Sequence, residues 1–397
     1  MTAALSTRVR QLSESPTLAI SAEAKRLRSQ GVDVIGFGAG EPDFATPDHI
    51  VAAARAACDE PAMHRYSPTA GLPALRDAIA TKTARDSGLE IDAAQVTVSN
   101  GGKHALFNVF QALVDPGDEV LLPAPYWVSY PEQIGLAGGT AVPLATTAAD
   151  GYRVTVEQLE AARTPATKAL VFVSPSNPTG SVYTPQQVRE IGRWAAEVGV
   201  WVITDEIYEH LVYDGAEFAS MPVVAPETAP TCVVVNGVAK TYAMTGWRVG
   251  WSIAPPPVAA AINRLQSHVT SHPSNVAQRA ALAAVKGPMT QVDAMRDTYD
   301  QRRRLVHEAF SRIDEVVCPM PDGAFYVFPD VSARLKRPVN GRTITTSLEL
   351  CNLLLDDVKV ALVPGEGFGA PGHVRLSYAL SDEELQKGLT RIVDVLQ

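Results

Sequence analysis

Runs of apolar or β-branched residues recur along the first two thirds of the chain, and polar residues follow four of the five runs. The runs are Gln95–Ser99, Glu119–Leu122, Lys168–Val173, Val200–Thr204 and Thr231–Val235. Strands buried on both faces have such runs, whereas half-buried strands alternate apolar and polar residues. Because helical patterns separate the runs, the sequence predicts an α/β fold with a mainly parallel sheet and right-handed crossovers.

The starts of two helices can be predicted from capping residues. Thr184 offers an N-cap hydroxyl, a proline follows it, and Gln187 occupies the third helical position. Thr46, which precedes Pro47, is expected to cap a second helix in the same way. A third helix is expected from about residue 103 to 114.

The pattern changes near residue 291, where a long charged helix is expected to run to residue 313. Its arginines, Arg302–Arg304, are expected to face solvent. Short apolar runs at 324–328 and 374–380 then indicate a smaller α+β region. The expected organisation is an N-terminal arm with part of the small domain at 1–45, a large domain at 46–290 and a C-terminal small domain at 291–397.

Composition and charge narrow the possible functions. With 43 acidic and 34 basic residues among 397, the formal net charge is −9, which argues against nonspecific binding to nucleic acid or anionic membranes. The sequence has no signal-peptide pattern and no apolar run long enough to span a membrane. The 4 cysteines form no CxxC pair. We therefore expect a cytoplasmic protein with reduced thiols whose ligands are small molecules.

Polar side chains of varied chemistry follow four of the five predicted strands. They are Gly102 and Lys103 after the first run, Asn177 after the third, Asp205 and Tyr208 after the fourth, and Lys240 with Arg248 after the fifth. Parallel strands end at one edge of a sheet, and ligands of such sheets bind there. These groups are therefore expected to converge on one ligand.

The convergent groups match the parts of one cofactor. A glycine-rich turn that opens a helix offers N–H groups to a phosphate, and Arg248 offers further donors. Asp205 can keep a pyridine nitrogen protonated, while Asn177 and Tyr208 can bond a phenolate oxygen. Lys240 can form a Schiff base with an aldehyde. A phosphate, a pyridine, a phenol and an aldehyde on one small molecule describe pyridoxal 5'-phosphate.

The chain also carries the motifs GEPDF, GGK, PYWVSYP, SPSNPTG, DEIYEHL and AKTYAMTGWRVG. With them it resembles the fold-type I, class I pyridoxal-phosphate-dependent aminotransferases, and among these the bacterial aspartate aminotransferases. The resemblance covers nearly the whole chain, from about Arg8 to the end. It implies a large domain that binds the cofactor on a mainly parallel central sheet and a smaller α+β domain.

The resemblance implies roles for the residues around the cofactor ring. Lys240 is expected to form the Schiff base and then to move the proton between the substrate α-carbon and the cofactor. Asp205 is expected to pair with the pyridinium nitrogen, and Tyr208 with the ring oxygen. Asn177 is expected to bond the same oxygen and Trp127 to stack on the ring, and both would also border the substrate.

The resemblance further implies a shared phosphate site. Gly102, the Lys103 backbone and Arg248 are expected to hold the phosphate. Tyr66 matches a tyrosine that the family lends to the phosphate site of the neighbouring subunit, which implies a homodimer.

One departure from the family concerns this phosphate site. The family often has Ser or Thr three residues and one residue before the cofactor lysine, but Gly237 and Ala239 stand here. The side-chain donors that the family uses at these positions are therefore missing, which puts the tightness of cofactor binding in question.

Other residues are expected to read the two ends of the substrate. Arg375 matches the arginine that binds the α-carboxylate, and Gly40 matches a backbone contact to the same group. In this branch of the family a lysine of the GGK motif reads the distal carboxylate, supported by small hydroxyl residues near the N-terminus. These would be Lys103, Ser15 and Thr17, which favours aspartate and glutamate over neutral amino acids.

The expected reaction is a ping-pong transfer of the amino group from L-aspartate to 2-oxoglutarate, giving oxaloacetate and L-glutamate. A prephenate or aromatic amino acid aminotransferase stays open, since prephenate also carries a second carboxylate. A carbon–sulfur lyase on the same fold is a further alternative, because it would share Lys240, Asp205 and Arg375. No metal site is expected, since His268 and His272 have no apparent third ligand.

Overall fold

A seven-stranded sheet is the largest sheet in the computed structural model, which describes residues 5–10, 12 and 16–397, without the side chains of 16–18. In sheet order its strands are β2 (Val96–Ser99), β8 (Gly250–Ile253), β7 (Cys232–Gly237), β6 (Trp201–Asp205), β5 (Thr167–Val173), β3 (Glu119–Ala124) and β4 (Thr140–Ala145). Strands β7, β6, β5, β3 and β4 are parallel to one another. Strand β8 is antiparallel to both of its neighbours, β2 and β7.

The five predicted strands are all confirmed, and the chain has the predicted α/β fold. The sequence pattern did not predict β4 and β8. Strand β4 lies at the edge of the sheet and is largely accessible, so it lacks a buried apolar run. Strand β8 has only four residues and begins with a glycine.

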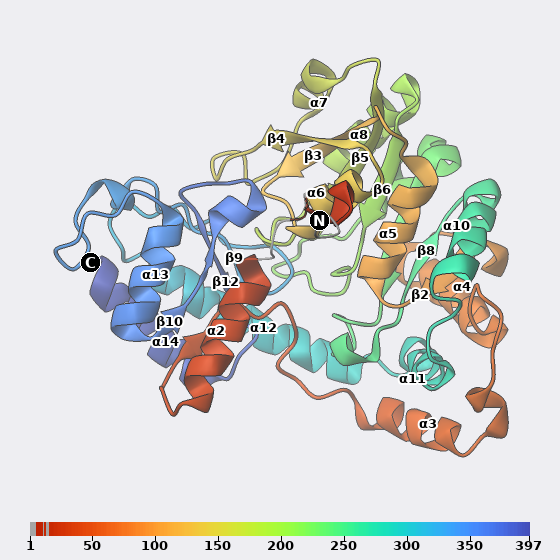
Figure 1. Cartoon of the computed structure of the whole chain (residues 1–397), viewed down its shortest axis with the longest axis horizontal. Helices are drawn as coiled ribbons and strands as arrows, with labels where there is room; N and C mark the ends of the chain where they lie inside the picture. Colours follow the sequence, from red (N-terminus) through yellow and green to blue (C-terminus); the bar gives the residue numbers. More distant parts are fainter. Residues whose placement is uncertain (1–4, 11, 13–15) are drawn as a thin grey trace.

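Helices cover both faces of this sheet (Figure 1). Leu170 and Phe172 of β5 pack on one side, whereas Ala169 and Val171 pack on the other, so the apolar run is unbroken because both faces are covered. The helices of this part are α3 (Asp48–Cys58), α4 (Pro73–Ser87), α5 (Gly102–Leu113), α6 (Ser129–Leu136), α7 (Val156–Ala162), α8 (Pro185–Val198), α9 (Met221–Val224), α10 (Pro256–Val269) and α11 (Asn275–Lys286).

The remaining elements form a second, smaller body with its own apolar core, seen at the left of Figure 1. Its elements, together with the N-terminal helices, are α1 (Thr7–Arg10), α2 (Pro16–Ser29), β1 (Ile35–Gly36), α12 (Thr290–Phe310), β9 (Tyr326–Val327), α13 (Ser347–Val358), β10 (Val360–Ala361), β11 (Val363–Pro364), β12 (Val374–Ser377) and α14 (Asp382–Leu396). Strand β1 pairs with β10, which brings the N-terminal segment to the C-terminal part of the chain. None of the described helices is long and apolar enough to cross a bilayer.

The two predicted helix starts had different outcomes. Thr184 caps α8 as predicted, with Gln187 completing the capping box. The prediction for Thr46 was wrong, because α3 begins at Asp48 with Pro47 as its N-cap residue. The Thr46 hydroxyl instead donates to the Ala243 carbonyl at 2.7 Å. It therefore ties its loop to the segment that follows Lys240.

The expectation that Arg302–Arg304 face solvent was also wrong for two of the three residues. Arg302 is buried and pairs with Asp43 at 2.9 Å and with Asp382 at 2.7 Å. Arg303 is fully buried and pairs with Asp214 and Asp300. Arg304 alone of the three is exposed. The burial is possible because acidic partners from distant segments compensate the two charges.

Candidate active site

The carboxyl ends of the parallel strands β5, β6 and β7 deliver the central polar residues of the site. Asp205 is the last residue of β6, while Asn177 and Lys240 follow β5 and β7 by a few residues. Strands β5 and β6 are paired in parallel, as are β6 and β7, so these three residues leave the sheet at the same edge. The structure thus brings these three predicted residues to one edge of the sheet, as expected from the sequence.

Lys240 points its amine at the loop of the GEPDF motif. Its Nζ donates a hydrogen bond to the carbonyl oxygen of Gly40. The same amine lies 5.6 Å from the ring centre of Phe325 and 5.9 Å from that of Tyr208. Burial lowers the pKa of Lys240 to about 8, against an opposing effect of the Glu41 charge. Near neutral pH a usable fraction of this amine is therefore unprotonated and nucleophilic.

Asp205 is buried and held from two sides. The hydroxyl of Tyr130 donates to its Oδ2 at 2.9 Å, and the backbone N–H of Ile207 donates to its Oδ1 at 3.2 Å. Burial raises the pKa of Asp205 to about 6, although the bond from Tyr130 works in the opposite direction. Trp127 meets Tyr130 edge to face, with ring centres 5.3 Å apart. These contacts fix the carboxylate that is predicted to face a pyridine nitrogen.

Arg375 is fully buried and its guanidinium is oriented by polar and aromatic contacts. Nη1 donates to Oδ1 of Asn177 at 3.0 Å, and Nη2 donates to the carbonyl of Gly38 at 2.9 Å. The guanidinium carbon lies 4.7 Å from the ring centre of Tyr326 and 4.9 Å from that of Phe368. The guanidinium is therefore presented as a preorganised fork of donors, the geometry that suits a carboxylate.

Tyr326 connects this arginine to the ring side of the site. Its hydroxyl lies 2.9 Å from the hydroxyl of Tyr208, which is itself buried. A Cβ added at Gly40 would lie 3.4 Å from the same Tyr326 hydroxyl, so the GEPDF loop passes close by. Gly40, Lys240, Tyr208, Asn177 and Arg375 are thus joined by short contacts.

The glycine-rich turn before α5 packs tightly against Arg248. Gly101 has a φ of +87°, and a Cβ there would lie 2.7 Å from Nη2 of Arg248. A Cβ at Gly250 would lie 2.3 Å from the backbone nitrogen of Gly102. The first N–H groups of α5, those of Gly102 and Lys103, have no partner within the helix, as at any helix N-terminus. The helix N-terminus and the arginine together bring several N–H donors to one place, which suits a phosphate.

The structure explains why a glycine stands at position 237, which the sequence did not reveal. A Cβ at this position would lie 3.0 Å from both the Cα of Gly250 and the carbonyl oxygen of Val249. Both atoms belong to the backbone and cannot rotate away. A serine or threonine here would therefore need β7 and β8 to separate by about a few tenths of an ångström.

Lys103 lies over the indole of Trp127, with Nζ 4.8 Å from the ring centre. Burial, assisted by the nearby positive charge of Arg248, lowers the pKa of Lys103. Ser15 lies outside the described residues. Thr17 belongs to α2, but its side chain is not among those described.

Tyr66 is 93% exposed, and its ring meets that of His272 edge to face at 5.9 Å. His272 accepts from the backbone N–H of Ser67 at 3.0 Å, and its other nitrogen lies 2.8 Å from the Pro273 carbonyl. Both ring nitrogens therefore already have protein partners.

Tyr130 and Tyr326 are the residues of this site that the sequence analysis did not single out. Tyr130 lies in the PYWVSYP motif, so its position next to Trp127 was the available signal. Tyr326 comes from β9, and only the pairing of β9 with β12 brings it beside Arg375. No local sequence pattern predicts the pairing of β9 with β12.

The chain is similar in sequence and in fold to aminotransferases. The family model for aminotransferase class I and II matches residues 32–392. An aspartate aminotransferase of Streptomyces avermitilis is 60% identical over 99% of this chain and 96% of its own length. An aspartate/prephenate aminotransferase of Cereibacter sphaeroides is 43% identical over 98% of this chain and 97% of its own. The structure of a Thermus thermophilus aspartate aminotransferase with maleate matches at 42% identity and a TM-score of 0.93, covering 100% of both chains.

Proposed function

The chain belongs to the class I and II aminotransferase family, and from that premise we propose that it transfers the amino group of L-aspartate to 2-oxoglutarate with pyridoxal 5'-phosphate as cofactor. The observation that carries the proposal is a pair of cations at the site. Arg375 is buried beside Asn177, and Lys103 reaches over Trp127 from the start of α5. Two cations suit a substrate with two carboxylates.

The donor set of the site fits pyridoxal 5'-phosphate. The N-terminus of α5 and Arg248 lie so close together that a Cβ at Gly101 would clash with the Arg248 guanidinium. Asp205 is a buried carboxyl group with one hydroxyl and one N–H partner, and it gains a favourable cation if it meets a protonated ring nitrogen. When bound, the cofactor supplies an aldehyde that condenses with amines and a ring that withdraws electrons from the substrate α-carbon.

The chain's own residues then divide the work of the reaction. Lys240 would hold the cofactor through its aldehyde at rest, and its free Nζ would take up and later release the proton that leaves the substrate α-carbon. Its lowered pKa suits an amine that must both accept and release a proton near pH 8. Asp205 would keep the ring nitrogen protonated, and Tyr208 would donate to the ring oxygen.

Substrate recognition uses the two ends of the molecule. Arg375 binds the α-carboxylate through the fork that Asn177 and Tyr326 orient. Lys103 binds the distal carboxylate, and its position over an indole partly desolvates the ammonium, which strengthens the ion pair. Ser15 and Thr17 complete the distal site in this proposal.

We further propose that the protein works as a cytoplasmic homodimer. The exposure of Tyr66 supports the dimer, because the family lends a tyrosine at this position to the phosphate site of the neighbouring subunit. The four cysteines are all free, which suits a reducing compartment. We also propose domain boundaries after residues 45 and 290. The confinement of the seven-stranded sheet to residues 96–253 supports them.

The visible spectrum of the protein loaded with pyridoxal 5'-phosphate tests the proposal. We expect a visible band that disappears when L-aspartate alone is added, and no such response in Lys240→Ala. A band that ignores aspartate but disappears with phenylalanine or another amino acid would refute the substrate assignment and keep the cofactor. Release of pyruvate and ammonia without a 2-oxo acid would identify a lyase instead.

A further inference from the structure

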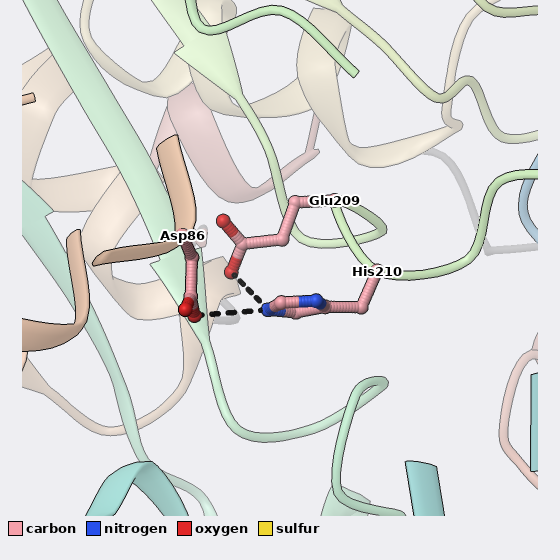
Figure 2. Close-up of side chains that lie close together, drawn as sticks. All are labelled: Asp86, Glu209 and His210. Carbon is pink, nitrogen blue, oxygen red and sulfur yellow. Dashed lines mark hydrogen bonds and ion pairs between the residues drawn. The ribbon is translucent and has the colours of Figure 1, made fainter. Parts of the chain in front are cut away.

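A cluster of charged side chains lies directly behind the turn that carries Tyr208, on α4 and on the segment after β6. Figure 2 shows Asp86, Glu209 and His210 pointing toward one another. Nε2 of His210 lies 3.1 Å from Oδ2 of Asp86 and 3.6 Å from Oε1 of Glu209. The proposed reaction assigns no role to these residues.

The cluster contains its own cation, Lys82 of α4, whose side chain is only 2% exposed. Its Nζ lies 3.0 Å from Oδ2 of Asp86 and forms a short ion pair with Oε1 of Glu209. The side chains of Asp86 and Glu209 are 7% and 5% exposed. Since an ammonium already lies between the two carboxylates, the arrangement is a buried ion-pair network and not a vacant metal site.

The network joins two parts of the chain that are far apart in sequence. Lys82 and Asp86 are one turn apart on α4, which packs on β2 through Leu75 and Ile79. Glu209 follows Tyr208 directly, and its backbone N–H closes the turn by donating to the Glu206 carbonyl at 3.0 Å. Tyr208 and Glu209 are therefore neighbours on one tight turn, with one side chain toward the active site and the other toward the network.

We propose that Lys82 is a positioning residue for Tyr208: by holding Glu209 and Asp86 it anchors the turn and so fixes the Tyr208 hydroxyl relative to the cofactor ring. The inference rests on the proposed function, because the bond from Tyr208 to the ring oxygen belongs to that proposal. A buried ion pair restricts the relative arrangement of the segments that it joins. A displaced turn would also move Tyr326, whose hydroxyl bonds that of Tyr208.

Other charged or polar groups lie next to the same network and contribute to its electrostatic energy. Arg85 lies 2.5 Å from Asp86 at its more exposed edge. The buried hydroxyl of Tyr242, which has no hydrogen-bond partner among the described residues, lies within the electrostatic reach of Lys82 and Glu209. Glu206 is buried on the same turn and bonds Ser220 at 2.9 Å.

The test is a spectroscopic titration of the protein loaded with pyridoxal 5'-phosphate. A hydroxyl that donates to an anionic ring oxygen favours the deprotonated form of the chromophore, so its displacement moves the midpoint of the visible transition to higher pH. We expect Lys82→Met to raise this midpoint by about 0.5 to 1 pH unit, since full loss of a hydrogen bond to a charged group corresponds to about 1 to 2 units. We also expect kcat to fall more than KM rises.

A matched control separates positioning from general loss of stability. Arg334 is a second buried cation, with bonds to the carbonyls of Leu396 and Pro338 at 2.8 and 3.4 Å in the smaller body. Arg334→Met is expected to lower the Tm without moving the spectral midpoint. If Lys82→Met does not fold, Glu209→Gln, which keeps the size of the side chain, is measured by the same criterion.

Each outcome decides one point. An unchanged midpoint in a folded Lys82→Met or Glu209→Gln variant, with a lower Tm only, overturns the positioning role. A raised midpoint in Arg334→Met as well overturns it too, since the shift would then report destabilisation. If the unsubstituted protein shows no visible band with the cofactor, the proposed function fails, and this result is distinguishable from a failure of the inference alone.

Discussion

Replacing Glu206 by glutamine should stabilise the protein in a strongly pH-dependent way. Glu206 is 3% exposed, and its Oε1 accepts from the hydroxyls of Ser220 at 2.9 Å and Thr204 at 3.3 Å. Burial, reinforced by the negative charge of Glu209, raises the pKa of Glu206 to about 8. The folded protein therefore keeps this carboxyl group protonated at neutral pH, whereas the unfolded chain ionises it.

The sign of the effect follows from the proton balance. Between the unfolded pKa of 4.5 and the folded pKa of about 8 the folded state binds more protons than the unfolded state, so stability falls as the pH rises through this interval. The interval of about 3.5 units corresponds to about 5 kcal/mol at full extent, at about 1.4 kcal/mol per unit. Glutamine resembles the protonated acid in shape and cannot ionise. We expect Glu206→Gln to gain about 2 to 5 kcal/mol at pH 9 and almost nothing below pH 5.

Urea unfolding at pH 5, 7 and 9, at one fixed protein concentration, measures this difference. Asp205 also has a raised pKa and contributes its own pH dependence, but it is present in both proteins and cancels in the comparison. Glu190→Gln, the same chemical change at an exposed position of α8, is the matched control and should show no trend with pH. A gain for Glu206→Gln that is equal at pH 5 and pH 9 would refute the reasoning.

Three further predictions concern the active site. Lys240→Ala should lower kcat by at least about 10²- to 10⁴-fold, because no other amine can move the α-proton; turnover near the original rate would contradict the assignment. Lys103→Ser should raise KM for aspartate by about 10- to 100-fold and for a neutral amino acid by less than about threefold; equal effects would show that Lys103 does not read the distal carboxylate. Tyr130→Phe removes a hydrogen bond that lowers the pKa of Asp205, so this pKa should rise above its present value of about 6. Because the ionised carboxylate is the form that pairs with a protonated ring nitrogen, the pH at which half of the cofactor is retained should rise by about one unit. An unchanged retention profile would count against this link.

The sequence predicted the sheet and the common edge at which several candidate site residues lie, because both depend on local patterns. Continuous apolar runs identified β5, β6 and β7, and the residues that follow them, such as Asp205 and Lys240, lie at one edge as expected. These features require only that each strand be buried on both faces and that neighbouring strands be parallel.

The failures arise where distant segments meet. Arg302 lies in a run that looks solvent-exposed, and only the approach of Asp43 and Asp382 makes its burial possible. Thr46 has the residue type and neighbour of an N-cap, but its hydroxyl is more useful to the loop after the cofactor lysine. The place of Tyr326 in the site could not be predicted for the same reason, since its partner Tyr208 lies 118 residues away. Local propensity was overridden at each of these places by a tertiary contact.

The exposed ring of Tyr66 has a consequence for mixtures of two variants of this protein. If each site borrows this residue from the other copy, a defect at Tyr66 and a defect at Lys240 damage different halves of the assembly. Two separately inactive proteins, Tyr66→Ala and Lys240→Ala, would then complement each other when they are dissociated together and allowed to reassociate. Random pairing would restore both residues in about a quarter of all sites. Activity would thus depend on how copies with different substitutions pair, and not only on the substitution that each copy carries.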